Sequence, residues 1–382
     1  MKENFEVAGQ KVLLVLPMFI DKNVGTGIWK KNVGIASAFK QNGYEVDRLE
    51  FSTKDVRIGA KVFYVFSRNR VLRRLQYQFL CWNVLADPAL CNYSFVWFRV
   101  PVPIVGAYCR FLKMVRNASA SGRVILEFGA YPYANELTFF NKILYNIGRR
   151  LEGRLFNHAD FVVTYCEQVF LHGKPVIPIT NGYSGGYCHE GLTKSGSSKT
   201  TIVCVSSFQR WHGIDRLING VGLYVAGNAS VEVEVLLVGD GEEFDRAKSL
   251  IKSLSLEGVV FLLGRKFGIE LEEIYARSHI AIGSLGAHRI GLNSLCSLKV
   301  REYLAFGLPV VLSSVDRDLV PESGFVHYVS ADEHPIDLHQ VIEFVKSVYK
   351  NPSISTHISN FARRSLTWDS KIRSALRFMQ DQ

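Results

Sequence analysis

Hydrophobic and polar positions alternate along the chain in blocks that predict strands and helices in turn. The first block is the continuous apolar run KVLLVLPMF from Lys11, and a glycine-containing loop follows it. An amphipathic pattern over 29–41 then predicts a helix, and an apolar pattern over 44–51 predicts a second strand. A strand, helix and strand in this order predict two parallel strands joined by a right-handed connection.

The same alternation continues through both halves of the chain. In the first half, strands are predicted at 61–67, 94–100, 123–128 and 160–166, and helices at 68–83, 104–117 and 135–156. In the second half, strands are predicted at 201–206, 231–238, 259–263, 280–284, 309–313 and 326–329, and helices at 215–225, 242–254, 271–278, 298–306, 337–349 and 358–379. The pattern indicates two doubly wound α/β domains, with ligands expected in a cleft outside the carboxyl ends of the strands.

A polar KSGSSK stretch from Lys194 marks the predicted boundary between the domains. We expect an N-terminal domain over 1–193, onto which 360–382 packs back, and a C-terminal domain over 200–359. The apolar runs reach only about ten residues, roughly half of what a membrane-spanning helix needs. The polar first ten residues do not resemble a signal peptide, so a cytoplasmic protein is expected. Seven cysteines without a C-x-x-C pair predict reduced thiols and no zinc site.

Charge divides unequally between the two halves. The whole chain has a net charge of +10. Residues 1–193 carry 24 Lys and Arg against 14 Asp and Glu, whereas 194–382 carry 21 of each, so the first half holds the entire excess. Such asymmetry indicates an anionic partner for the first half: nucleic acid, anionic lipid or a phosphorylated substrate.

The most informative motif is SLCSLKVREYLAFGLPVVLSS, from Ser294. Ser297 is placed to cap a helix in which Lys299 and Glu302, three residues apart, share one face near the N-terminus. Free backbone N–H groups and Lys299 would suit a nucleotide diphosphate, and the Glu302 carboxylate could accept two ribose hydroxyls. The alternative is an exposed ion pair at a helix end, worth less than about 1 kcal/mol.

The stretch SLKVREYLAFGLPVV resembles the nucleotide-sugar site of glycosyltransferase family 4, the retaining enzymes with the GT-B fold. It is most similar to a subset from bacterial capsule, exopolysaccharide and O-antigen synthesis. Further pieces that follow the family's order are the glycine loop after the first strand, EFGAYPY, PITNGY, SSFQRWHGIDRLI, LLVGDGEEF, EIYARSHIAIGSLGAHRIGL and SLTWDSKI. The resemblance implies two Rossmann-like domains facing a cleft, with a C-terminal helix that crosses back to the first domain.

The resemblance also implies roles for residues of the nucleotide-sugar site. Many members carry two glutamates, of which Glu302 fills the ribose-binding place while Ser294 stands at the place near the sugar. Where many members have an arginine and a lysine that hold the diphosphate, this chain has Ser207 and His212, with Arg210 between them. The diphosphate cation is therefore expected, in order, to be Arg210, Lys299 or His212, although a turn histidine is an equal alternative for His212.

Other positions match the family's donor-binding loops. The loop Gly25-Thr26-Gly27 would lie against the donor phosphate and the acceptor, Arg265 would lie near the base, and Arg289 with Gly291 would contact the transferred sugar. Leu298 begins the predicted nucleotide-binding helix. For each of these, an ordinary surface loop is the alternative.

Two acidic positions have competing interpretations. Glu127 lies at the carboxyl end of a predicted strand, where it could orient the acceptor hydroxyl or act as a base, although a structural carboxylate is favoured. Asp316-Arg317-Asp318 spells the D-x-D metal motif of a different glycosyltransferase fold, and we interpret it as coincidental. No metal and no cofactor are expected, because helix ends and basic side chains would meet the departing diphosphate.

The resemblance implies transfer of a sugar from a UDP- or GDP-sugar to a saccharide or lipid-linked saccharide. Basic and apolar residues are mixed in the predicted helices 68–83 and 104–117, which favours an anionic membrane surface, with peripheral location on the inner face of the plasma membrane. A solvated basic face is the alternative. A nucleotide-sugar epimerase or hydrolase, or a basic nucleic-acid-binding protein, are the other functions considered; no nucleic-acid motif supports the last.

Overall fold

The chain divides into two compact units. In the computed structural model, unit 1 comprises Met1–Ser184 and Trp368–Gln382, and unit 2 comprises Gly185–Thr367. This division falls earlier at the first boundary, and later at the second, than the domain limits expected from the sequence. The structure describes residues 9–19, 27–69, 71–73, 76, 85, 87–90, 92–101, 104, 106–118, 122–129, 131, 143, 145–146, 148–165, 169–184, 199–227 and 231–382.

Unit 1 is built on a mixed seven-stranded sheet. Its strands are β1 (Lys11–Phe19), β2 (Glu45–Phe51), β3 (Asp55–Ile58), β4 (Lys61–Val65), β5 (Phe95–Arg99), β6 (Arg123–Glu127) and β7 (Phe161–Val163), in the spatial order β4-β3-β2-β1-β5-β6-β7. The five strands from β2 to β7 in this order are parallel, and β3 and β4 form an antiparallel edge. The order reverses between β1 and β5, which is where open α/β sheets bind ligands.

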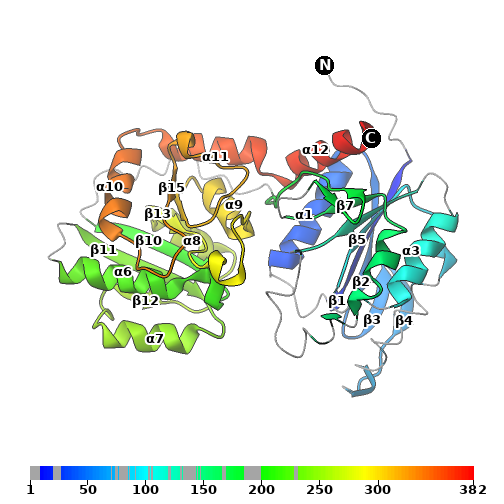
Figure 1. The fold of residues 1–382 in the computed structure, drawn as a ribbon, viewed down its shortest axis with the longest axis horizontal. Helices are drawn as coiled ribbons and strands as arrows, with labels where there is room; N and C mark the ends of the chain where they lie inside the picture. The colour runs from blue at the N-terminus through cyan, green and yellow to red at the C-terminus, as the bar shows by residue number, and fades with distance from the viewer. Residues whose placement is uncertain are drawn as a thin grey trace. The chain divides into compact units, whose positions relative to one another are not determined.

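Helices and a hairpin complete unit 1. They are α1 (Gly27–Gln41), the short η2 (Pro88–Leu90), α3 (Gly106–Ala118), α5 (Glu152–Phe156), the hairpin of β8 (Phe170–Leu171) and β9 (Lys174–Pro175), and α12 (Trp368–Gln380). The C-terminal α12 lies beside α1 (Figure 1). The contact is close at Gly34, where an added Cβ would lie 2.1 Å from Cδ1 of Trp368.

Gly34→Ala should therefore weaken the packing of α12 on α1. A methyl group at this position overlaps a rigid indole, and such overpacking costs about 1–3 kcal/mol. Faster hydrogen exchange in both helices would measure the loss. The matched control is Gly153→Ala in α5, where an added Cβ meets no atom within 4 Å, so this variant should be neutral or slightly more stable. Equal exchange in the two variants would contradict the prediction.

Unit 2 is built on a fully parallel six-stranded sheet. Its strands are β10 (Lys199–Ser206), β11 (Glu232–Gly239), β12 (Val260–Leu262), β13 (Ile280–Ile282), β14 (Val310–Leu312) and β15 (Val326–Tyr328), in the spatial order β12-β11-β10-β13-β14-β15. Its helices are α6 (Ile214–Ala226), α7 (Phe244–Ser253), α8 (Ile269–Arg277), α9 (Leu298–Ala305), α10 (Leu338–Val348) and α11 (Ile354–Ser365), with short η4 (Arg210–His212), η5 (Ala287–Ile290) and η6 (Pro321–Ser323).

The alternation predicted from the sequence is confirmed within the described residues, with three differences. Most of the predicted helix 68–83, and residues 135–142 of the predicted helix 135–156, lie outside the described residues. The C-terminal pattern forms two helices, α11 and α12, which are separated at Leu366 and Thr367, where the chain leaves unit 2. Strand β3 was not predicted because DVRI is short and half charged. The β8–β9 hairpin was not predicted because each strand has two residues; its turn residues, His172 and Gly173, both have positive φ.

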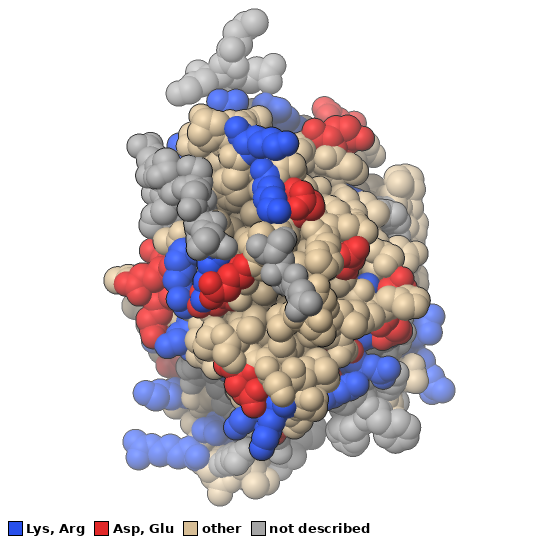
Figure 2. All heavy atoms as spheres, turned by 90° about the vertical axis from the view of Figure 1, so that its left-hand side faces the viewer, with Lys and Arg blue, Asp and Glu red and all other residues tan. Residues whose placement is uncertain are grey.

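None of the helices in the described ranges is long and apolar enough to span a membrane. On the face of unit 2 that Figure 2 presents, Lys and Arg lie interspersed with Asp and Glu. This mixture agrees with the neutral charge balance of the second half of the sequence.

Candidate functional site

The site predicted in unit 2 lies at the carboxyl edge of its sheet. All six strands run in the same direction, so the loops that follow them gather at one edge, where the connecting helices begin. The predicted residues follow three of these strands: Ser207, Arg210 and His212 after β10, Arg265 after β12, and Arg289, Gly291, Leu298, Lys299 and Glu302 after β13.

Lys299 is the most unusual residue of this edge. The residue as a whole is partly exposed, but its Nζ atom is buried and has no hydrogen-bond partner in the described part of the chain. Burial lowers the pKa of Lys299, and the nearby Cys204 thiol only partly opposes this effect. The alternative of an exposed ion pair is therefore excluded for Lys299. An ammonium group buried near a helix N-terminus could interact favourably with an anion.

Ser297 and Leu298 form the start of the helix that carries Lys299. Ser297 occupies the N-cap position as predicted, but its side chain makes no capping hydrogen bond, and α9 begins at Leu298. Glu302 lies one turn further along α9, where its Oε2 accepts a 3.5 Å hydrogen bond from the Tyr275 hydroxyl. Tyr275 is buried in α8 and makes an edge-to-face contact with Tyr303 of α9, so α8 packs against α9 beside the Glu302 carboxylate.

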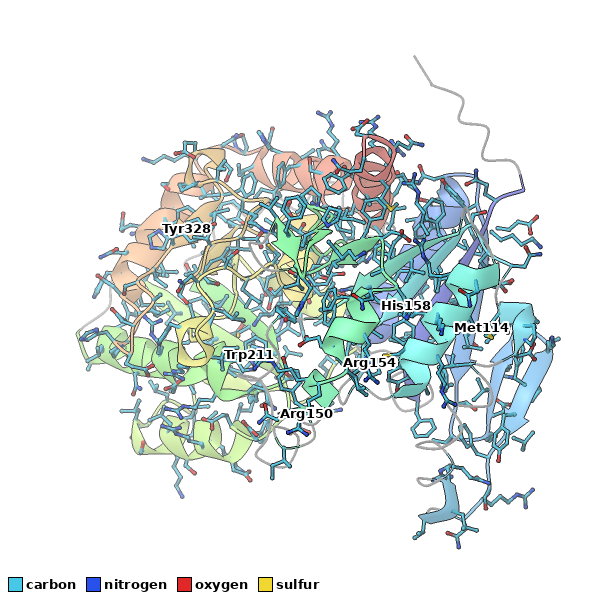
Figure 3. The ribbon with its side chains drawn as sticks, turned by 45° about the vertical axis from the view of Figure 1, so that its right-hand side comes forward. Met114, Arg150, Arg154, His158, Trp211 and Tyr328 are labelled. Carbon is cyan, nitrogen blue, oxygen red and sulfur yellow. The ribbon has the colours of Figure 1, made fainter. Side chains whose placement is uncertain are left out.

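His212 and Arg210 lie in η4, directly after β10. His212 is buried, and its Nδ1 accepts a 3.0 Å hydrogen bond from the backbone N–H of Gln209, so its proton must lie on Nε2. Burial and the charge of Lys299 lower the pKa of His212 to about 2, which keeps the ring neutral. Trp211, labelled in Figure 3, contacts the ring in a tilted arrangement with ring centroids 3.9 Å apart. Arg210 is exposed. His212, rather than Arg210, thus shares the buried environment of Lys299.

Ser207 and Arg265 lie in exposed loops of the same edge. The turn Gly239-Asp240-Gly241 packs tightly on the Ser207 loop, since a Cβ on Gly241 would lie 2.0 Å from the Ser207 carbonyl oxygen. The Arg265 Nε lies 3.6 Å from a carboxylate oxygen of Asp240, and both side chains are more than half exposed. This position fits the predicted role of Arg265 and an ordinary loop arginine equally well.

Arg289 forms hydrogen bonds that hold together the loops at this edge of the sheet. Its guanidinium donates to both carboxylate oxygens of Asp215 at 2.8 and 2.9 Å, to Glu333 and to the Arg210 carbonyl oxygen. Its side chain is 6% exposed, and these hydrogen bonds raise its pKa further. Gly291 ends η5 with a φ of 74°, a conformation that favours glycine. Since every Arg289 nitrogen is already used, the geometry favours a positioning role that joins η5 to η4 over direct contact with a sugar.

The D-x-D motif has a structural role. The Arg301 guanidinium binds both Asp316 and Asp318, and Arg301 and Asp316 are fully buried. These carboxylates are therefore committed to an arginine, in agreement with their interpretation as a coincidental motif. Among the described residues, no cluster of three or more His, Cys, Asp and Glu side chains could hold a metal ion.

Glu127 lies at the carboxyl end of β6 in unit 1 and is buried among donors. Its oxygens accept from Lys31 Nζ, Arg99 and Trp97 Nε1, each at 2.7 Å, and from the Tyr165 hydroxyl at 3.2 Å. Burial opposes ionisation, but the charges of Lys31 and Arg99 outweigh it and lower the pKa of Glu127. Such a carboxylate is a weak base, so the geometry favours the structural interpretation.

The sequence did not identify Lys31 and Arg99 as members of this cluster. Arg99 and Glu127 are register partners at the ends of β5 and β6, so adjacent strand ends could have indicated their contact. Lys31 gives no such signal, because it follows another lysine on a helix that reads as amphipathic. Gly25 and Thr26 lie outside the described residues, and Gly27 begins α1 in an exposed position.

Comparison with known proteins agrees with this architecture. Residues 199–345 match the family model described as glycosyl transferases group 1. No curated protein matches the chain in sequence. Sucrose-phosphate synthase from Thermosynechococcus elongatus is 15% identical, with 97% of this chain and 98% of that chain covered and a TM-score of 0.64.

Two further solved structures are similar in fold. The lipopolysaccharide outer core galactosyltransferase WaaB, in its apo form, is 11% identical, with 97% and 100% of the two chains covered and a TM-score of 0.59. Anabaena HepE, in complex with UDP and glucose, is 14% identical, with 98% and 100% covered and a TM-score of 0.55. These identities establish the fold alone. The chain thus has the GT-B fold, and its second unit matches the group 1 glycosyl transferases.

Proposed function

We propose that the protein is a retaining glycosyltransferase of family 4 that transfers a sugar from a UDP- or GDP-sugar to a saccharide or lipid-linked saccharide. Its pathway would be the synthesis of a bacterial surface polysaccharide, and its location the inner face of the plasma membrane. The family match of residues 199–345 and the GT-B fold support the reaction class. HepE, whose structure contains UDP and glucose, supports a nucleotide-sugar donor.

The observation that carries the proposal is the buried ammonium group of Lys299. Cleavage of the bond between sugar and diphosphate builds negative charge on the leaving phosphate, and a preorganised cation stabilises that charge. Lys299 Nζ has no partner in the described residues, so a phosphate oxygen would satisfy it. The Nε2–H of His212 is a neutral donor in the same buried environment. Chemistry then needs leaving-group stabilisation and alignment of the acceptor, without a metal.

Buried polar atoms without partners among the described residues also occur in the loops that follow β13, where the family resemblance implies contact with the sugar. They are the hydroxyl oxygens of Ser284 and Ser294 and the Nδ1 atom of His288, each unpartnered within the described ranges. Ser294 stands where many family members have a glutamate near the sugar. Because buried polar atoms are normally hydrogen-bonded, this group supports a polar ligand in the loops after β13.

Glu302→Gln tests the nucleotide assignment. If Glu302 binds the ribose, the amide retains one acceptor oxygen but loses the charge, and affinity for the nucleotide should fall about tenfold. Calorimetric titration with UDP and with GDP measures the change and identifies the base. Glu273→Gln, at an exposed position of α8, is the matched control and should bind as the unaltered protein does. Unchanged binding by Glu302→Gln would reject the ribose role.

The geometry of unit 1 does not favour the epimerase or hydrolase alternative. Such chemistry needs a base, and the carboxylate predicted there, Glu127, is held ionised by four donors and has a lowered pKa. An acceptor hydroxyl that is aligned on a donor sugar requires no strong base, because the departing diphosphate can accept its proton.

A further inference from the structure

The positive excess of the first half of the chain has no role in the proposed donor site, which lies in unit 2. Part of this positive charge lies on α3 of unit 1. Arg110, Lys113 and Arg116 follow one another at three-residue spacing and are all exposed, so they form a single stripe along the helix. Phe111 and Leu112 are fully buried in the core beneath it. The basic and apolar residues that were predicted to be mixed on this helix therefore lie on two separate faces, an exposed basic face and a buried apolar face.

Basic residues from two neighbouring elements extend this stripe. The Cys109 thiol of α3 donates a 3.8 Å hydrogen bond to the Leu151 carbonyl oxygen, which places α5 alongside α3. The residues Arg154 on α5 and His158 just after it come from this neighbouring helix; Figure 3 labels both, together with Met114 of α3. We define the α3–α5 basic face as the following residues: Arg110, Lys113, Arg116, Arg154, His158 and Lys174.

The electrostatics of His158 show that these charges act on one another. Partial burial lowers the pKa of His158, and the charges of Lys113, Arg116 and Lys174 lower it further. Arg116 has a counter-ion, because its guanidinium lies 2.9 Å from a carboxylate oxygen of Asp160. For Lys113, Arg154 and Lys174, no hydrogen bond to a carboxylate is present among the described residues. These three residues thus contribute positive charge without a carboxylate partner among the described residues, whereas Lys and Arg are interspersed with Asp and Glu on the face of unit 2 in Figure 2.

Apolar side chains are exposed on the hairpin that carries Lys174. Val169 is 74% exposed and Phe170, in β8, is 64% exposed. Water does not favour such side chains at the surface, and the phosphates of a polynucleotide would not cover a valine. The headgroup region of a bilayer accommodates both kinds of group, because phosphates meet the cations while Phe and Val enter the acyl boundary.

From this arrangement we propose that the α3–α5 basic face, with the adjoining hairpin at Val169 and Phe170, docks on the surface of an anionic lipid bilayer. The proposal rests on the proposed function, since it gives the enzyme access to a lipid-linked acceptor. It assigns the membrane contact to α3, α5 and the β8–β9 hairpin, whereas the sequence interpretation relied on 68–83 and on the whole of 104–117.

The test is co-sedimentation of the full chain with vesicles of phosphatidylcholine and phosphatidylglycerol in equal parts. The variant Lys113→Glu/Arg154→Glu/Lys174→Glu should lose at least about 100-fold in partitioning, since each basic residue near such a surface contributes about 1 kcal/mol. The matched control is Lys248→Glu/Lys252→Glu/Lys350→Glu, which has the same net charge but alters exposed positions of unit 2. It should partition within about threefold of the unaltered protein.

Two further measurements separate the possible outcomes. Phe170→Ser should reduce partitioning about tenfold, because the variant cannot bury a phenyl ring in the acyl boundary. UDP binding measured by calorimetry should be unchanged in all of these variants. A failure of the proposed donor site can therefore be distinguished from a failure of the membrane proposal. Equal losses in both triple variants, binding to pure phosphatidylcholine, or tighter binding of an oligonucleotide through the same residues would overturn the proposal.

Discussion

Lys299→Met is expected to make the free protein more stable and, at the same time, to weaken UDP binding by about 100-fold. The ammonium group is buried without a partner in the described residues, so an apolar side chain of similar length removes a desolvation cost. The free energy of unfolding of unit 2 should rise by about 1–2 kcal/mol. The lost charge-assisted hydrogen bond to the diphosphate accounts for the weaker binding. Thermal unfolding with and without UDP measures both effects.

The opposite signs of the two effects distinguish a ligand site from a structural lysine. A residue that holds the fold together would lose stability on substitution, and its effect on binding would follow from that loss. Lys252→Met, at an exposed position of α7, is the matched control and should leave both the unfolding midpoint and the shift caused by UDP unchanged. A fall in the midpoint of Lys299→Met would show that the ammonium group has a structural partner.

The sequence was sufficient to predict those helices and strands that local patterns of residues determine. Continuous apolar strands such as β1 and β10, and the cap and turn residues around α9, predicted both sheets and the position of Lys299 and Glu302. Patterns of two to four residues, as in β8 and β3, carry too little periodicity to be predicted. The break between α11 and α12 could not be predicted either, because both helices have apolar residues at helical spacing and only their packing in different units separates them.

The functional roles of single charges were predictable only in part, because they depend on partners distant in the sequence. Arg289 reads as a flexible loop cation, but Asp215 and Glu333 hold its guanidinium. A structural role was favoured for Glu127, but its partner Lys31 could not be predicted, because it lies on a helix almost a hundred residues earlier. Such contacts depend on which strands and helices lie next to one another in the fold. They therefore cannot be predicted from the local pattern around either residue.

Glu127→Gln should destabilise unit 1 strongly, by about 3–5 kcal/mol. The substitution leaves the Lys31 amino group, whose pKa burial already lowers to about 7, and the partly buried Arg99 guanidinium without their shared counter-charge. In addition, an amide nitrogen would face hydrogen-bond donors. Lys31→Met should cost less than about 1 kcal/mol, because Glu127 keeps Arg99, Trp97 and Tyr165 as donors and the repulsion between the two cations is removed. The double variant should therefore recover part of the stability that Glu127→Gln loses.

Hydrogen exchange resolved by peptide measures this difference within unit 1. Exchange in α1 and β6 should accelerate about 100-fold or more in Glu127→Gln, while β10 to β15 in unit 2 remain unchanged. Because Glu127 stays ionised below its ordinary pKa of 4.5, its contribution is complete above that pH and is lost as the pH falls below it. When both proteins are measured at the same acidic pH, the exchange rates of the unaltered protein should thus approach those of Glu127→Gln. Equal, small effects of Glu127→Gln and Lys31→Met would indicate that water already screens the cluster, since only buried charges make the loss of one partner so unequal.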